Sequence, residues 1–152
     1  MTIKTSTGLR NYVMASGSLK AALDGYVLNI YAGTEPATAD AALGAATLLT
    51  TVSVGGTGTG VTFASAAADG VLQKNASEAW SGTIVAGGES LPAVFYRLQA
   101  PDDTGLASTM ARRVQGGVGP SRDLKISSTT LVVGNEQPID SYYLSWPYMP
   151  GV

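Results

Sequence analysis

Turn-forming residues interrupt this chain about every 8 to 12 positions, and that spacing limits what it can fold into. Nineteen glycines and seven prolines supply the turns, and short β-branched, aromatic and aliphatic runs lie between them. The clearest runs are YVLNIYAG (26–33), TLLTTVSV (47–54) and PAVFYRLQA (92–100). Many short strands joined by frequent turns are typical of β-sandwiches and small barrels. We therefore expect a mainly β protein, a β-sandwich or jelly-roll-like barrel of about 8 to 10 short strands.

One short helix is expected near the N-terminus, in SGSLKAALDG (16–25), where Ser16 or Ser18 can cap the first turn and Gly25 ends it. At 152 residues we expect one domain, with an arm (1–15) before a single β-rich domain (16–152) that ends in an aromatic segment. The remaining predicted strands lie in VTFASA (61–66), VLQKNASEAWSGTIVAGG (71–88), ASTMARRVQGGVG (107–119), DLKISST (123–129), TLVVG (130–134) and IDSYYLSW (139–146).

The amino acids that are missing narrow the possible chemistry. The chain has no cysteine and no histidine, which removes disulfides, the usual zinc sites and Ser-His-Asp or Cys-His catalysis. The formal charge is −2, and only 13% of residues are charged, against about 25% in an average chain. No apolar run approaches about 18 residues, and no apolar stretch follows the first basic residues. We expect no cofactor, no nucleic acid, no membrane and no secretion.

Asp103-Thr104-Gly105 is the tripeptide that carries the catalytic carboxylate of aspartic proteases. Such an enzyme needs two of these loops, because two carboxylates share one proton. Here one loop is present, and Pro101 and Asp102 before it indicate a turn after a strand. Aspartic proteases support this loop with a second motif of apolar residues and a Gly, which LVVG (131–134) resembles. LVVG follows the tripeptide too closely to leave room for the strands that lie between the two motifs in those enzymes. The tripeptide is interpreted as a turn, and no enzyme is predicted.

Three other clusters were weighed for binding. GGTGTG (55–60) lacks the spacing of a phosphate-binding loop and is interpreted as a hairpin tip. Asp102, Asp103 and Asp123 lack the spacing of a calcium loop and are interpreted as turn acids. Five of the nine basic residues fall within 29 positions, and the nearby acids favour ion pairs or an acidic partner over nucleic acid: Arg97, Arg112, Arg113, Arg122 and Lys125.

The C-terminal segment IDSYYLSWPYMP (139–150) concentrates four aromatic rings. Either Tyr143 and Trp146 complete the core while the other rings lie on the surface, or the segment docks on a neighbouring molecule. Aromatic residues dominate the binding energy of protein interfaces, so both interpretations stay open.

Several phrases, taken in order, resemble a family of small structural proteins of tailed bacteriophages. They are STGLRNYVMASGSLKAALDGYVLNIYAGTEPATADAAL, then LQAPDDTG, then RRVQGGVG followed by DLKISSTTLVVG. The shared order is a short N-terminal helix, a strand ending in Tyr-x-Gly, a P-x-x-A-D loop, a strand with aromatics and Arg, a Gly-rich turn and an Asp-Leu strand. The resemblance covers residues 5–145 and implies a virion protein assembled in the bacterial cytoplasm.

Within a virion, a capsid decoration or cement protein is the first expectation. Such a protein binds the shell of the major capsid protein from outside and gains avidity from many copies. Proteins of this kind are often trimers at threefold axes, so self-association is implied. Alternatives are a tail or neck component (tube, terminator or fibre base) and a carbohydrate-binding module. Candidate interface residues are Lys4, Arg10, Tyr12, Arg112, Arg113, Tyr142 and Tyr148.

Overall fold

The computed structural model describes residues 3–145. Strands account for 34% of the chain and helices for 10%, which confirms the mainly β, sandwich-like class. The elements are β1 (Lys4–Thr5), α1 (Thr7–Ala15), α2 (Leu19–Leu23), β2 (Val27–Ala32), β3 (Thr47–Val54), β4 (Val71–Gln73), β5 (Trp80–Thr83), β6 (Phe95–Gln99), β7 (Val114–Gly119), β8 (Leu124–Lys125), β9 (Glu136–Ile139) and β10 (Tyr143–Ser145). None of the helices in this part of the chain has the length and apolar character that a membrane span needs.

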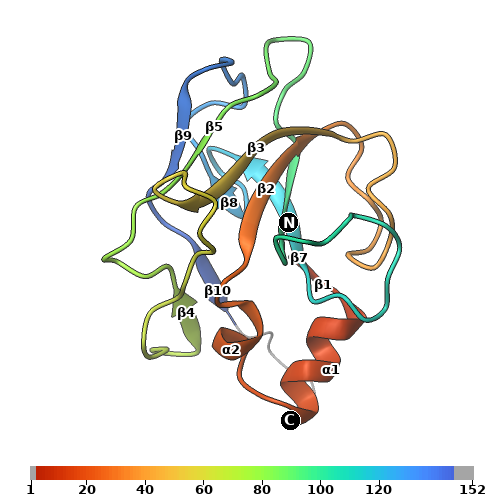
Figure 1. Ribbon diagram of the computed structural model, residues 1–152, viewed down its shortest axis with the longest axis vertical. Helices are drawn as coiled ribbons and strands as arrows, with labels where there is room; N and C mark the ends of the chain where they lie inside the picture. Colours follow the sequence, from red (N-terminus) through yellow and green to blue (C-terminus); the bar gives the residue numbers. More distant parts are fainter. Residues whose placement is uncertain (1–2, 146–152) are drawn as a thin grey trace.

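A main sheet runs in the order β1-β7-β6-β2-β3-β5-β9, with every neighbouring pair antiparallel. β8 joins this sheet beside β7 as its parallel partner, and β4 and β10 form a separate two-stranded sheet. Figure 1 shows both helices and the small sheet at the lower end of the molecule, and the turns beside β5 and β9 at the upper end. Pro138 fits its place in β9, because an edge strand tolerates a residue that cannot donate a backbone hydrogen bond.

One face of the main sheet carries the apolar core. Register places Leu28 opposite Leu98 and Ile30 opposite Tyr96, and all four side chains are fully buried. Four rings extend this core towards the small sheet. Phe63 meets Trp80 edge-on at 5.6 Å, Tyr142 lies against both, and the Tyr96 and Tyr142 hydroxyls share a hydrogen bond of 2.7 Å.

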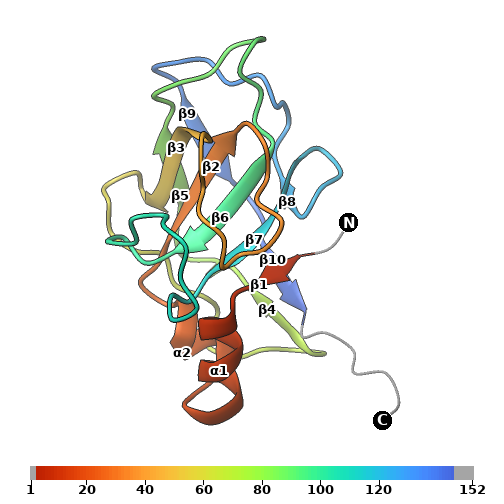
Figure 2. The same cartoon turned by 90° about the vertical axis from the view of Figure 1, so that its right-hand side faces the viewer.

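The opposite face of β2, β6 and β7 is also covered, and beside a Tyr31–Phe95 ring stack it carries a polar cluster, for which we call it the polar face. Asn29, Arg97 and Gln115 lie in one cross-strand row, with Gln99 two residues beyond Arg97 on the same face. Two long loops cover this face, residues 33–46 between β2 and β3 and residues 100–113 between β6 and β7 (Figure 2). The loops are bonded to each other, since Leu43 N–H donates to Gly105 C=O and Ser108 N–H donates to Asp40 C=O.

The predicted short helix is α2, capped by Ser18, whose side chain accepts from Ala21 N–H, and followed by Gly25 at φ +86°. A second helix, α1, occupies most of the segment expected to be an arm. Its cap is Ser6, which is fully buried between the helix and the start of β7. Residues 4–15 therefore belong to the folded domain and are not a free arm.

The strands predicted at 26–33, 47–54 and 92–100 are confirmed as β2, β3 and β6. The strand predicted at TLVVG (130–134) is wrong: residues 132–135 form a turn, closed by the Asn135 N–H and the Val132 C=O. The strand of this region is β9, which begins two residues later. The turn interpretation of GGTGTG is confirmed, because Val54 N–H donates to Thr59 C=O across that tip.

Candidate functional site: two exposed surfaces and a buried polar network

Four of the seven predicted interface residues lie on α1 or close to it, and their side chains have different partners: Lys4, Arg10, Tyr12 and Arg112. Lys4 pairs with Glu35 at 3.3 Å and donates to the Pro36 carbonyl. Arg10 is exposed on α1, and its Nη2 donates to Thr7 Oγ1. Tyr148 lies outside the described residues.

Tyr12 and Arg112, from distant parts of the chain, meet in one stack. The Arg112 guanidinium lies 4.4 Å from the Tyr12 ring centre and 5.6 Å from that of Tyr26. Its Nε also donates to the Tyr26 hydroxyl at 2.8 Å. A guanidinium that stacks on aromatic faces and donates to a hydroxyl is fixed in direction. The stack therefore fixes a cation beside α1.

Two predicted interface residues are buried, so their assignment to a surface is corrected. Tyr142 is part of the aromatic core described above. Its neighbour Tyr143 is the exposed ring of the pair, at 52%, which also reverses the expectation that Tyr143 completes the core. Arg113 is buried on the polar face, while Arg112, the residue before it, points away from that face and stacks on Tyr12.

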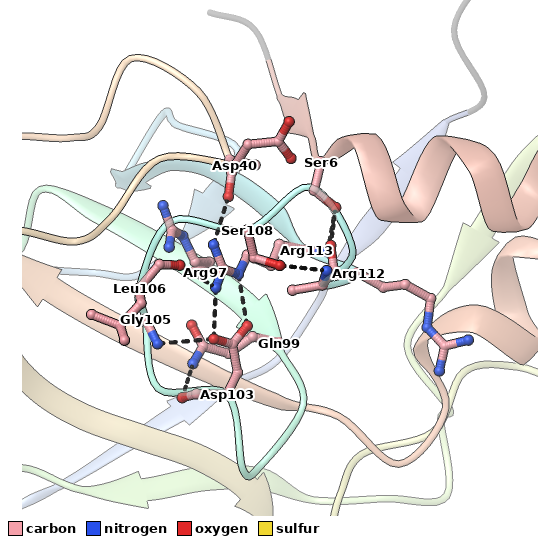
Figure 3. A network of polar contacts seen from close by, with 12 residues as sticks. Ser6, Asp40, Arg97, Gln99, Asp103, Gly105, Leu106, Ser108, Arg112 and Arg113 are labelled. Atoms are coloured by element: carbon pink, nitrogen blue, oxygen red, sulfur yellow. Dashed lines mark hydrogen bonds and ion pairs between the residues drawn. The ribbon is translucent and has the colours of Figure 1, made fainter.

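Arg113 forms the centre of the buried polar network in Figure 3, and its main partner is Asp103. Nε and Nη2 donate to the two carboxylate oxygens of Asp103 at 2.6 and 2.7 Å. The other donations reach backbone carbonyls of both covering loops, at Ala39 and Leu106. This two-pronged, charge-assisted geometry is the strong form of an ion pair.

Asp103 is therefore a structural turn acid in this fold. The Gly105 N–H donates to its Oδ1 at 2.9 Å, and Gly105 takes φ +76°, which closes the turn. Burial alone raises the pKa of Asp103, but the hydrogen bonds from Arg113 and Gly105 outweigh that effect, and the net shift is downwards. The carboxylate is held charged by Arg113, which is the opposite of a proton-sharing pair.

Arg97 lies beside this pair and is fully buried without a carboxylate of its own among the described ion pairs. Its Nε and Nη2 donate to Gln115 Oε1, and Nη2 donates also to the Ala41 carbonyl. Burial, and then the nearby Arg113 charge, lower the pKa of Arg97 to about 10. Three buried polar atoms of this face have no hydrogen-bond partner among the described residues: Arg97 Nη1, Asn29 Oδ1 and Gln99 Oε1. The charged groups of Arg97, Asp103 and Arg113 thus bond to other groups of the same chain and lie away from the surface.

The other acidic residues do not gather. Asp123 Oδ2 accepts from the Gly117 N–H next to β7, while Asp102 is exposed at the turn. Among residues 3–145, no three histidine, cysteine or acidic side chains come together as metal ligands.

The surface residues that sequence reasoning missed are exposed and apolar. At the lower end of the molecule, Leu106 and Met110 line an open groove of about 560 Å³ together with Tyr26 and Arg112. We call Arg10, Met14, Leu106, Met110 and Arg112 the helix-end surface. At the upper end, Val85, Val132 and Val133 project from two adjoining turns, and with Glu89 and Glu136 they form the strand-end surface. The signal in the sequence was an apolar residue inside a run of turn formers, as in Val132-Val133-Gly134-Asn135.

We compared the chain with models of protein families, with curated proteins and with solved structures, and none of these comparisons gave a significant match.

Proposed function

We propose that this chain is a bacteriophage virion structural protein, a capsid decoration protein that binds the shell of the major capsid protein and stabilises it. The observation that carries the proposal is that one folded domain carries two sets of exposed apolar side chains, one beside α1 and one in the segments beside β5 and β9, elements that lie toward opposite ends of the fold in Figure 1. Exposed apolar side chains that gather in one patch mark contact surfaces. A module with one such surface at each end can bridge neighbouring subunits of a shell. The ordered motifs that resemble phage structural proteins support the same class.

The buried network supports a structural role in a second way. Loops 33–46 and 100–113 are tied to the sheet by guanidinium and amide groups, so the loop that carries Leu106 and Met110 is fixed before any partner binds. Preorganised surfaces lose less conformational entropy on association. Repetition over many copies then turns a small contact into a stable one.

The test mixes the purified protein with capsids of the source phage that lack it and measures co-sedimentation. We expect saturation at several hundred copies per shell. Capsids that already carry the protein are the matched control, because their sites are filled and additional binding should be absent. Absence of binding to the bare capsids would contradict the decoration role.

A tail or neck component is the second candidate, and one observation favours it. The two apolar surfaces differ in sequence and lie at opposite ends, which suits the repeated contacts of a ring or tube. Absence of capsid binding, together with rings or tubes of the free protein in electron micrographs, would support this role over decoration.

A further inference from the structure

The tip of the strand-end surface combines a residue type and a backbone shape that rarely occur together. Val132 and Val133 occupy the turn that Asn135 N–H closes onto Val132 C=O, with Gly134 at φ +92°. They are 58% and 60% exposed, so neither contributes to the core. Turns favour Gly, Asn, Asp, Pro and Ser, and β-branched residues favour strands. A local choice that conflicts with the fold and buries nothing points to a contact outside the molecule.

The strand-end surface is held rigidly and is acidic. Ile84 N–H donates to Asn135 C=O and Gly134 N–H donates to Ile84 C=O, which fixes the valine turn beside exposed Val85. The two segments that build this end, residues 83–91 and 131–137, contain Glu89 and Glu136 and no basic residue. A partner that fits it has an apolar patch with cations beside it.

The helix-end surface has that composition. Helix α1 and residues 104–112 contain Arg10 and Arg112 and no acidic residue. The acids around them are Asp102 and the Arg113-paired Asp103, which line the same groove, and Asp40, which accepts from Thr7 at the start of α1. Met110 is 83% exposed, and its backbone is fixed because Met110 N–H and Ala111 N–H both donate to Ser108 Oγ. The helix packs tightly here, since a Cβ on Gly8 would lie 2.2 Å from the Met110 carbonyl oxygen.

We propose that the strand-end surface of one molecule docks on the helix-end surface of a second copy, with valines against Leu106 and Met110 and glutamates facing Arg10 and Arg112. The two surfaces lie at opposite ends, so such a contact leaves one free surface at each end of the pair and association continues head to tail. The inference extends the self-association implied by the proposed function, but it needs no capsid.

The test is sedimentation velocity of the full chain over a range of concentrations up to about 1 mM, the regime of weak contacts. We expect the average mass of the wild type to rise with concentration. V132S/V133S removes one surface, L106S/M110S removes the other, and each variant alone should associate at least about tenfold more weakly. Tyr143→Ser is the matched control. It removes an exposed side chain that belongs to neither surface, so this variant should associate as the wild type does. Unchanged thermal unfolding shows that the variants fold.

An equimolar mixture of the two double variants is the decisive measurement. Each supplies the surface that the other lacks, so the mixture should form heterodimers and nothing larger. A wild type that stays monomeric, variants that associate as the wild type does, or a mixture that stays monomeric would each overturn the inference. Capsid binding by the wild type is measured separately, so a failure here is distinguishable from a failure of the decoration role.

Discussion

Both faces of the main sheet are covered, but different chemistry stabilises each of them. On one face, Leu28, Ile30 and Leu98 pack against an aromatic cluster. On the other face, Arg97 and Gln115 lie beneath the covering loops, hydrogen-bond each other, and each donate to a loop carbonyl. The apolar face is stabilised by excluding water and tolerates changes that keep volume. The polar face depends on hydrogen bonds between buried groups, so removing one group leaves its partner buried without a hydrogen bond.

The largest expected effect comes from breaking the polar face at its ion pair. Asp103→Ala leaves Arg113 as a buried charge without its carboxylate, next to the Arg97 charge. We expect a loss of about 3 to 5 kcal/mol in the free energy of unfolding. Urea denaturation measures it, and Asp102→Ala, at the exposed neighbour, should stay within about 0.5 kcal/mol. A small effect of Asp103→Ala would mean that water reaches the network.

The apolar face should respond almost as strongly but for a different reason. Leu28→Ala opens a cavity beside Leu98 without stranding any polar group. We expect a loss of about 3 kcal/mol. Leu28→Met, which nearly conserves volume, should cost less than about 1.5 kcal/mol, and the same denaturation series compares them. An equal cost for both variants would contradict the view that this face is governed by volume.

A smaller effect is expected where a polar pair lies within the apolar face. Tyr96→Phe removes one hydroxyl and leaves that of Tyr142 buried without its partner, at a cost of about 1 to 3 kcal/mol. The double variant Y96F/Y142F removes both groups and should be nearly as stable as the wild type. A double-mutant cycle measures the coupling. If the two single costs simply added, the hydroxyls would not depend on each other.

The smallest effect is the acid sensitivity of the polar face. The pKa of Asp103 is lower in the folded chain than its usual value of about 3.9, so its stabilisation is present above that pH. It is lost as the pH falls through the lowered folded pKa. Asp103→Asn should flatten the dependence of unfolding on pH below about 4. The slope that remains belongs in part to Asp40 and Glu78, whose pKa values are also lowered: burial opposes the shift in each, and hydrogen bonds from Thr7 and Thr62 outweigh it. A slope unchanged in Asp103→Asn would exclude the ion pair as its source.

The difference between the faces also explains which predictions from sequence succeeded. The β-branched and aromatic runs that form β2 and β6 are a local pattern and were recognised as strands. The burial of Arg97 was not, because a polar residue that alternates in a strand usually faces water, and the loops that cover it come from elsewhere in the chain. Alternation places Tyr142 and Tyr143 on opposite sides, but only the packing of the small sheet decides which is inside.

The candidate surfaces were harder to predict than the fold. Val132-Val133 has the composition of a strand, and only the pairing of β5 with β9 shows that it lies in a turn. Arg113 and Tyr142 were assigned to an interface because arginine and aromatic residues are frequent in interfaces, yet these types are equally able to serve as buried anchors. Arg112, next to one of them, shows that a shift of one position separates the two roles.

Ser6 has a consequence for the order of events during synthesis. Its hydroxyl donates to Ala111 C=O and accepts from Arg113 N–H, partners that lie 105 and 107 residues later in the chain. The ribosome delivers Ser6 among the first residues, but its partners emerge only after more than two thirds of the chain. The capping bond itself, from Leu9 N–H to Ser6 Oγ, is local and can form at once, but the two bonds that dock the cap on the start of β7 can form only later, when β2, β3 and β6 are already available to pair. The earliest part of the chain to be made is thus among the last to reach its native position, because its docking requires the residues just before β7.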